Sequence, residues 1–229
     1  MGDSKSGGSG RSGRRMGGAG YAPARLSLET ASDTFEKIYD ELPRSGSGYV
    51  NPKDVMARIY DVQGFNQKPE LISMAQFEQY GDQGELQLFR GIGPGPSGDR
   101  QYADDFIQGE KHFPGEGIFG NGTYTAAGRN SDGGWDNERA YMEAEDYAGP
   151  RGTVVQMTLR RGSRVATYEQ IQREQRQYQE RLIGQRKIPK PHLDDPGAFA
   201  AASGYDALVV HGGRYVVVLN RGALRIVKP

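Results

Sequence analysis

The sequence Tyr215-Val216-Val217-Val218-Leu219-Asn220 decides the fold class of the chain. Its apolar side chains alternate to both faces of an extended segment, which predicts a central strand that is covered on both sides. Further strands are predicted nearby at Ala207–His211 and Leu224–Val227, and earlier at Thr153–Leu159 and Leu86-Gln87-Leu88-Phe89-Arg90-Gly91-Ile92. Because short, irregular helices separate these strands in place of regular βαβ units, the sequence predicts an α+β fold.

Helices are predicted around these strands from apolar spacing and from capping residues. Asn51-Pro52 places an N-cap residue before a proline at the first helical position, and Ser73 and Gln76 have the spacing of a capping box. After Thr167 an apolar stripe lasts only about two heptads, which favours a helix packed on a sheet over a coiled coil. In the helix that ends at Ala148, one side is expected to carry Ala140, Ala144 and Tyr147. The predicted helices cover 28–42, 52–63, 73–80, 102–107, 135–148, 168–182 and 196–203.

The length of 229 residues fits one domain with an appended tail. Residues 1–24 are Gly, Ser and Arg-rich, so we expect a disordered tail that is solvated, in preference to one that contacts an acidic partner or nucleic acid. Residues 25–83 are expected to form a helical layer, and residues 84–229 the domain that carries the site.

Charge and residue content argue against several function classes. Basic and acidic residues number 29 each, which gives no global attraction to nucleic acid or to a membrane. The chain has no cysteine, which excludes disulfides and thiolate catalysis. His112, His192 and His211 are far apart without metal-ligand spacing, so no metal site is expected. Neither a secretory h-region nor an apolar run of about 18 residues occurs, so neither export nor a membrane span is predicted.

A second stretch, Gly115-Glu116-Gly117-Ile118-Phe119-Gly120-Asn121-Gly122-Thr123-Tyr124-Thr125-Ala126, concentrates glycine before a tyrosine that lies between two threonines. Glycine allows positive φ and a close approach of the backbone to another group. Arg90, at the end of a predicted strand, offers a planar fork for a phosphate or a carboxylate. Together these features predict a groove for an extended ligand that carries phosphate.

Other catalytic motifs fit less well. Gly115, Gly117 and Gly120 match the dinucleotide fingerprint in spacing, but no convincing strand precedes them and no helix follows. The chain contains neither a Gly-Lys-Ser/Thr P-loop nor a Gly-x-Ser-x-Gly elbow. Acidic residues are plentiful without a pair that stands out, so glycosidase-type carboxylates stay open as an alternative.

Three motifs in chain order resemble the mono-ADP-ribosyltransferase fold, in particular the ADP-ribosyltransferase-like proteins encoded by phages and prophages. These motifs are Phe89-Arg90-Gly91, Gly117–Ala126 and Tyr215–Gly222, and the resemblance covers roughly residues 70 to 229. It implies a split, mostly antiparallel β-core that clamps NAD⁺, with surrounding helices.

The resemblance also implies roles for individual residues. Arg90 would face the pyrophosphate or the nicotinamide-side phosphate, and the backbone of Gly91 would bond the nicotinamide amide. Tyr124 would stack on the nicotinamide ring, and the hydroxyl of Thr123 or Thr125 would hold the strand and the ribose. The implied catalytic residues are Arg90, Tyr124 and Thr125. The implied NAD-binding residues are Arg90, Gly91, Gly117, Asn121, Gly122, Thr123 and Tyr124.

The chain departs from the family pattern at the glutamates that stabilise positive charge on the ribose. The two glutamate positions fall on Arg214 and Val216, and neither residue can take that role. Either another carboxylate substitutes, or the register is shifted, or the domain does not transfer ADP-ribose. The candidate substitutes are Glu138, Glu143, Glu145, Glu169 and Asp206.

The resemblance therefore favours NAD-dependent mono-ADP-ribosylation of a protein acceptor of the host, in the host cytoplasm or by a protein carried in the virion. The alternatives are a degenerate fold that serves as a structural or interaction protein of the phage head, and an NAD-binding module without turnover. Purely structural explanations also exist, since Arg90 could form a surface ion pair and Tyr124 could be a core residue. Asn220 is typical of a turn and His211 of a loop edge.

Overall fold

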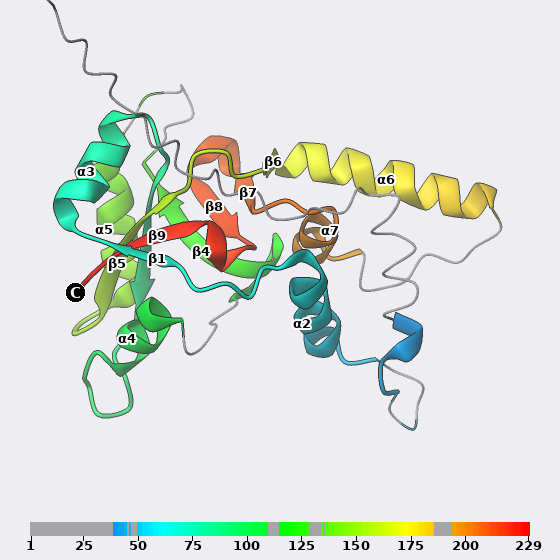
Figure 1. Ribbon diagram of the computed structural model, residues 1–229, viewed down its shortest axis with the longest axis horizontal. Helices are drawn as coiled ribbons and strands as arrows, with labels where there is room; N and C mark the ends of the chain where they lie inside the picture. Colours follow the sequence, from blue (N-terminus) through cyan, green and yellow to red (C-terminus); the bar gives the residue numbers. More distant parts are fainter. Residues whose placement is uncertain are drawn as a thin grey trace, which may run out of the picture.

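The computed structural model of the chain describes residues 39–44, 46, 50–109, 115–128, 134, 136–185 and 194–229. The tail predicted at 1–24 and most of the helix predicted at 28–42 lie outside these residues, although residues 39–41 are helical. The described part is α+β, as predicted, with helices arranged around one mixed sheet (Figure 1).

The sheet has nine strands in the order β1-β9-β5-β2-β4-β8-β7-β6, with β3 paired to β4. Only β1–β9 and β6–β7 are parallel among the described pairs, so the prediction of a mostly antiparallel core is confirmed. The strands are β1 (Glu70–Ile72), β2 (Gln87–Ile92), β3 (Gly115–Gly117), β4 (Gly120–Ala127), β5 (Thr153–Leu159), β6 (Val165–Thr167), β7 (Ala207–Val210), β8 (Tyr215–Val218) and β9 (Leu224–Val227).

Helices α2 and α3 begin at the caps predicted for them. The Asn51 side chain accepts a hydrogen bond from the Lys53 amide, and Ser73 and Gln76 form the reciprocal capping box. Gly64 ends the first of these helices in the left-handed conformation, with φ of 69°. The helices are α2 (Pro52–Gln63), α3 (Met74–Asp82), α4 (Gln101–Gln108), α5 (Asn137–Ala148), α6 (Tyr168–Gly184) and α7 (Pro196–Ala202), with 3₁₀ turns η2 (His211–Gly213) and η3 (Arg221–Ala223).

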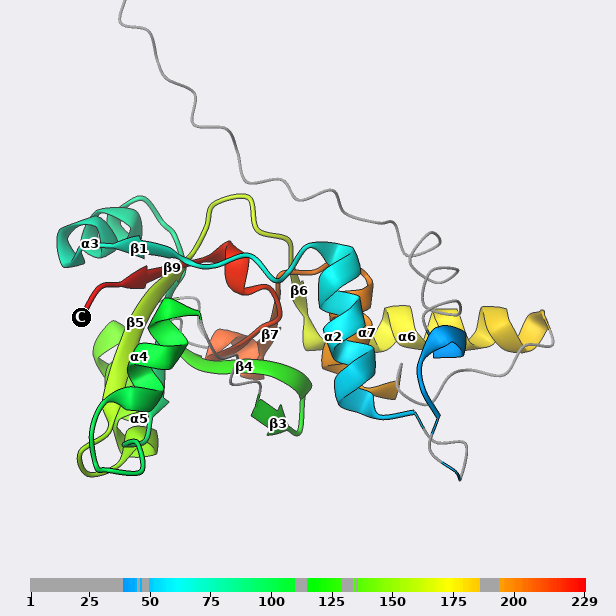
Figure 2. The ribbon, with the colours of Figure 1, turned by 60° about the horizontal axis from the view of Figure 1, so that its bottom comes forward.

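The helices are arranged around the sheet (Figures 1 and 2), and three apolar clusters of described residues hold them on it. Helices α3 and α5 cover one face of β2 and β4 through a cluster that includes Phe77, Phe89 and Ala144. Helix α4 covers the opposite face, where Phe106 packs in a cluster with strand residues that include Met157. Helices α2, α6 and α7 share a third cluster at the β8–β7 end of the sheet.

Helix α6 projects beyond the sheet (Figure 1) and packs on α7, β6 and β7. Its buried face consists of Ile171, Gln175, Tyr178 and Leu182. The prediction that this stripe packs within the fold, and is not a coiled coil, agrees with these contacts.

Strand β8 is the covered central strand that the sequence predicted. It lies between β4 and β7, and Val216, Val217 and Val218 are all fully buried. Val216 and Val218 pack in the cluster under α4, whereas Val217 packs in the cluster of α2, α6 and α7. Apolar residues in succession are therefore required because both faces of this strand are buried.

The sheet opens between β2 and β4, and this opening positions the candidate site. The two strands pair only at Leu88 with Ala127 and at Phe89 with Ala126. Beyond that point β2 remains paired to β5 as far as Ile92, while β4 remains paired to β8 back to Thr123. The carbonyls that face the opening need donors from outside the strand ladder.

Candidate functional site

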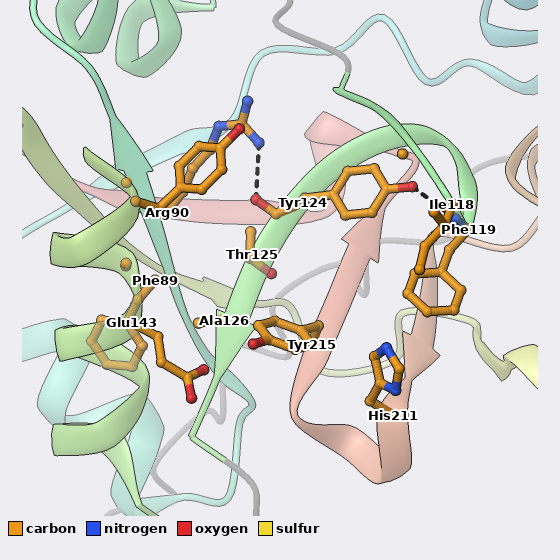
Figure 3. A pocket seen from close by; sticks show the side chains of 14 residues that line it. Phe89, Arg90, Ile118, Phe119, Tyr124, Thr125, Ala126, Glu143, His211 and Tyr215 are labelled. Atoms are coloured by element: carbon orange, nitrogen blue, oxygen red, sulfur yellow. Dashed lines mark hydrogen bonds between the residues drawn. The ribbon is translucent and has the colours of Figure 1, made fainter. Parts of the chain in front are cut away.

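A cavity of about 460 Å³ lies over the opening, between α5 and the β3–β4 hairpin (Figure 3). Five of the predicted residues line it, on three different strands. These are Arg90, Gly91, Gly117, Tyr124 and Thr125. The cavity is also lined by residues for which no ligand role was predicted: Phe89, Ile118, Phe119, Ala126, Ala144, Tyr147, His211 and Tyr215.

Arg90 spans the opening in the sheet. Its Nη1 donates a 2.9 Å hydrogen bond to the Tyr124 carbonyl oxygen of β4, which supplies the donor that strand pairing does not (Figure 3). The guanidinium also lies 5.2 Å from the ring centroid of Phe106 in α4. Burial lowers the pKa of Arg90 to about 10, so the side chain remains positively charged at neutral pH.

Tyr124 fixes the hairpin at the cavity wall. Its hydroxyl donates to the Gly120 carbonyl at 2.6 Å and accepts from the Phe119 amide at 3.2 Å. Gly117 is required opposite the ring, because a Cβ at this position would lie 2.4 Å from Tyr124. Burial raises the pKa of Tyr124, so the hydroxyl stays protonated and keeps its role as a donor.

Thr125 lies on the floor of the cavity and its hydroxyl donates to the Val216 carbonyl at 2.8 Å. This bond ties β4 to β8, which is one of the two roles expected for a hydroxyl in this motif. The side chain is 3% exposed, so it shapes the floor and holds the strand.

Gly91 brings α5 against the sheet. A Cβ at this position would lie 1.9 Å from the Ala144 carbonyl and 2.7 Å from the Ala148 amide. Only glycine permits this approach, and the approach carries Glu143 and Tyr147 to the cavity. Tyr147 was expected on the same side as Ala140 and Ala144, and these two are buried, but Tyr147 is 84% exposed at the cavity.

Glu143 is the carboxylate of the cavity. Its Oε1 accepts a 2.9 Å hydrogen bond from Arg214 Nε and lies 2.8 Å from Arg139 Nη1. Burial opposes ionisation of Glu143, but hydrogen bonds and charge from Arg214 and Arg139 outweigh burial and lower the pKa of the carboxyl. The group is therefore an anion at neutral pH.

The other four candidate carboxylates do not line this cavity. Glu138, Glu145 and Glu169 are exposed, and Glu138 lines a separate hollow between α3 and α5. Asp206 is fully buried and accepts hydrogen bonds from the Arg164 amide and from Asn220 Nδ2. It therefore has a structural role in the turns around β7 and β8.

An aromatic cluster forms the wall opposite α5 (Figure 3). The His211 ring packs edge-to-face on Phe119 at 4.9 Å and on Tyr215 at 5.9 Å. His211 has φ of 49°, a left-handed conformation that is uncommon for a residue other than glycine. Such a residue at a cavity is consistent with a functional position, and the sequence placed it only at a loop edge.

Asn121, Gly122 and Thr123, which were predicted to bind NAD⁺, do not line the cavity. The amide and Nδ2 of Asn121 both donate to Asp195, at 3.2 Å and 3.3 Å. Gly122 faces Val217, where a Cβ would lie 2.3 Å from a methyl group. Thr123 is fully buried. These residues join β4 to the core and to α7, and the prediction of direct contact has no support from their positions.

Asn220 has the turn role that its position suggested, because its side chain accepts a hydrogen bond from the Gly222 amide. Within the described residues, no group of three or more His, Cys, Asp and Glu side chains could hold a metal ion. None of the helices in that part of the chain is long and apolar enough to cross a membrane.

Comparison with protein-family models, with curated proteins and with solved structures gave no match to this chain.

Proposed function

We propose that this chain binds NAD⁺ at the cavity over the sheet opening and transfers its ADP-ribose to a protein acceptor. The observation that carries the proposal is that one cavity gathers Arg90, Gly91, Tyr124 and Thr125, which come from β2 and β4. The sequence resemblance implies that these residues contact one ligand, NAD⁺. Residues that contact one ligand must line one cavity, as these do.

The cavity has the chemistry that each part of NAD⁺ needs. Arg90 keeps its positive charge beside the opening, where a pyrophosphate oxygen would be attracted. Aromatic side chains on two walls, Tyr124 and Tyr147, offer surfaces for a planar ring. The Gly91 backbone lies in the lining without a side chain to cover it. A volume of about 460 Å³ is in the range of small-molecule sites.

The proposed reaction breaks the bond between ribose C1′ and nicotinamide N1. The electron pair of that bond stays on N1, so nicotinamide leaves as a neutral molecule. A lone pair on the acceptor forms the new bond to C1′, and the proton of the acceptor passes to solvent. Because positive charge develops on the ribose as the bond breaks, an anion placed in the cavity would stabilise the transition state.

Labelled NAD⁺ and isothermal calorimetry test the proposal together. Wild-type protein is expected to bind NAD⁺ and to label a protein of a bacterial host lysate. Arg90→Ala is expected to lose both NAD⁺ binding and protein labelling. Arg100→Ala is the matched control, because Arg100 is an exposed arginine at the start of α4. No binding of NAD⁺ by the wild-type protein would contradict the proposal.

A second function is favoured by one observation, which is that arginine and valine occupy the two positions where the family has glutamate. In this alternative the fold is a degenerate transferase that serves as an interaction module of a phage head. It predicts neither NAD⁺ binding nor labelling, and it predicts co-sedimentation with assembled heads. For the favoured function, we place the activity in an infected host cell, with the protein made there or delivered by the virion.

A further inference from the structure

We infer that Glu143, delivered by α5, is the catalytic carboxylate of the cavity, and that Arg214 is the residue that positions it. This inference rests on the proposed function. The third motif lacks the glutamate that stabilises positive charge on the ribose. Glu143 supplies that charge instead, and Arg214, at one of the two glutamate positions, holds Glu143 in place.

Arg214 lies between the turn η2 and strand β8. This residue directly precedes β8, and its carbonyl accepts a 2.8 Å hydrogen bond from the Ala127 amide at the end of β4. It thus occupies the strand position where the family pattern has its first glutamate. From there the side chain reaches across to α5, where Nε lies 2.9 Å from Glu143 Oε1 and Nη2 bonds the same oxygen.

The contact therefore brings a carboxylate from the helix to the arginine at the strand position. Glu143 lines the cavity together with Arg90, Tyr124 and Thr125, and Tyr215 lines it next to Arg214. Figure 3 shows Glu143 on the helix side of the cavity and His211 on the other side, with Tyr215 between them. Arg214, at the position where the family pattern has its first glutamate, therefore holds a carboxylate from α5 beside the cavity.

The two oxygens of Glu143 differ in their surroundings. Oε1 accepts both hydrogen bonds from Arg214 and lies next to Arg139. Oε2 is buried and accepts no hydrogen bond from the described residues. The negative charge on this oxygen is therefore not offset by a hydrogen bond of its own, and it adds to the negative potential at the α5 side of the cavity. A negative potential at this wall is what stabilisation of positive charge on a bound ribose requires.

The charge of Glu143 is fixed by its neighbours. The groups that face it are Arg139 on its own helix, Arg214 and Tyr215 at the start of β8, and, around the rest of the cavity, Arg90, Tyr124, Tyr147 and His211. Arg139 and Arg214 keep the carboxyl ionised, and Arg139 is anchored by a 3.0 Å hydrogen bond to the Ala127 carbonyl. A preorganised anion of this kind costs little reorganisation when positive charge develops.

The balance of the step is that of the proposed reaction, with Glu143 as a spectator that neither gives nor takes a proton. The C1′–N1 bond breaks with its electron pair on nicotinamide, and the carboxylate stabilises the positive charge on the ribose. Water in place of the protein acceptor gives ADP-ribose and a proton, so hydrolysis of NAD⁺ reports on the same step without knowledge of the acceptor.

The test compares Glu143→Gln, Arg214→Glu and the double variant Glu143→Arg/Arg214→Glu in NAD⁺ hydrolysis and in NAD⁺ binding. Glu143→Gln is expected to lower kcat by about 10²- to 10³-fold while the Kd for NAD⁺ changes by less than about threefold. Arg214→Glu places two carboxylates together and is expected to lower kcat as well. The double variant restores one carboxylate opposite one arginine. Its kcat should be at least about tenfold higher than the kcat of either single variant.

The positioning role of Arg214 has its own readout in the pH profile. Arg214→Ala removes a cation that lowers the pKa of Glu143, so the carboxyl takes up a proton at higher pH and the acid limb of kcat moves upward. Arg214→Lys keeps the charge and should return the limb towards that of the wild type. A purely structural role for Arg214 would lower stability without moving this limb.

Controls separate the outcomes. Glu145→Gln, on the exposed side of α5, should change neither hydrolysis nor binding, and the thermal unfolding of every variant shows that it folds. If the wild type hydrolyses NAD⁺ and Glu143→Gln does so equally fast, the inference is overturned and the proposed function stands. If the wild type binds NAD⁺ without any turnover, the catalytic role is overturned. If the wild type does not bind NAD⁺, the proposed function fails, and the inference fails with it.

Discussion

At the scale of single residues, Asp195 joins two elements that are far apart in the chain. Its Oδ1 accepts a 2.6 Å hydrogen bond from the Ala198 amide as the N-cap of α7, and both oxygens accept from Asn121 in β4. Gly120 and Gly197 allow this contact, since a Cβ on either glycine would collide with the partner segment. The hairpin that carries Tyr124 is therefore anchored on α7.

Replacement of Asp195 by alanine should lower the free energy of unfolding by about 1 to 3 kcal/mol, because α7 loses its cap and two part-buried donors of Asn121 lose their acceptor. Urea unfolding followed by circular dichroism measures this change. Asp195→Asn keeps an acceptor oxygen for the Ala198 amide and should cost less. A loss below about 0.5 kcal/mol for Asp195→Ala, the range of ordinary surface changes, would refute the anchor.

Gly91 offers a second test at this scale, because a neighbouring glycine in the same segment serves as control. In Gly91→Ala the new Cβ would meet the Ala144 carbonyl at 1.9 Å, so α5 must move away from the sheet. We expect a loss of about 1 to 3 kcal/mol in stability, typical of overpacking, together with weaker NAD⁺ binding. In Gly93→Ala the nearest atom would lie at 3.9 Å, and both properties should be unchanged. Equal effects of the two variants would contradict the close approach of α5.

The sequence predicted part of the site at this scale and not the rest, for a physical reason. A short motif can identify the site residues that lie together on one strand or one hairpin, as Arg90 and Gly91 do on β2 and Tyr124 and Thr125 do on β4. The contact of Asn121 with Asp195 joins residues that are 74 positions apart, and no local pattern reports it. A glycine-rich segment looks the same whether it faces a ligand or a helix.

At the scale of elements, charged groups hold strands β2, β5 and β9 of the sheet together. Glu85 precedes β2 and accepts two hydrogen bonds of 2.6 Å from Arg225 Nη1 of β9. It also accepts a 3.2 Å hydrogen bond from the Thr158 hydroxyl of β5. Since β5 lies between β2 and β9, this carboxylate ties three neighbouring strands together.

Glu85→Ala should therefore destabilise the protein by about 1 to 3 kcal/mol, because Arg225 and the Thr158 hydroxyl would lose this acceptor, although the 3.2 Å hydrogen bond from Arg225 to Glu70 would remain. Arg100→Ala, which breaks an exposed ion pair with Asp104, is expected to cost less than about 1 kcal/mol. Guanidinium unfolding is unsuitable because it screens charge, so urea unfolding at constant ionic strength is the measurement. Similar losses for the two variants would show that Glu85 behaves as a surface residue.

Element boundaries were predictable where capping groups lie next to the helix they cap, as with Asn51 and Ser73. The opening between β2 and β4 was not predictable in this way. It depends on β2 pairing with β5 over six residue pairs and with β4 over only two. The alternation of side chains in β2 is compatible with pairing to either β4 or β5. The sequence of β2 alone therefore does not determine where its pairing with β4 ends.

At the scale of the whole molecule, the helical segment before residue 84 and the strand-rich part share one core. Ile59 of α2 packs in a cluster that includes Phe199 of α7 and Leu208 of β7, and β1 pairs with β9 near the C-terminus. The sequence predicted a helical layer at 25–83 without its contacts to the strand-rich part, because a contact between segments about 140 residues apart has no local signature. We therefore expect the two parts to unfold together.

Ile59→Ala tests this expectation, since Ile59 is fully buried in the shared cluster. Deletion of its side chain should cost about 2 to 5 kcal/mol, and it should lower the midpoint of the whole thermal transition by roughly 2 to 4 °C for each kcal/mol. Calorimetry and the near-ultraviolet circular dichroism of the aromatic residues should report the same midpoint, with NAD⁺ binding lost in the same transition. Arg58→Ala, an exposed neighbour in α2, should leave the midpoint unchanged. A separate early transition in Ile59→Ala, after which NAD⁺ binding is still retained, would show that α2 is an independent layer.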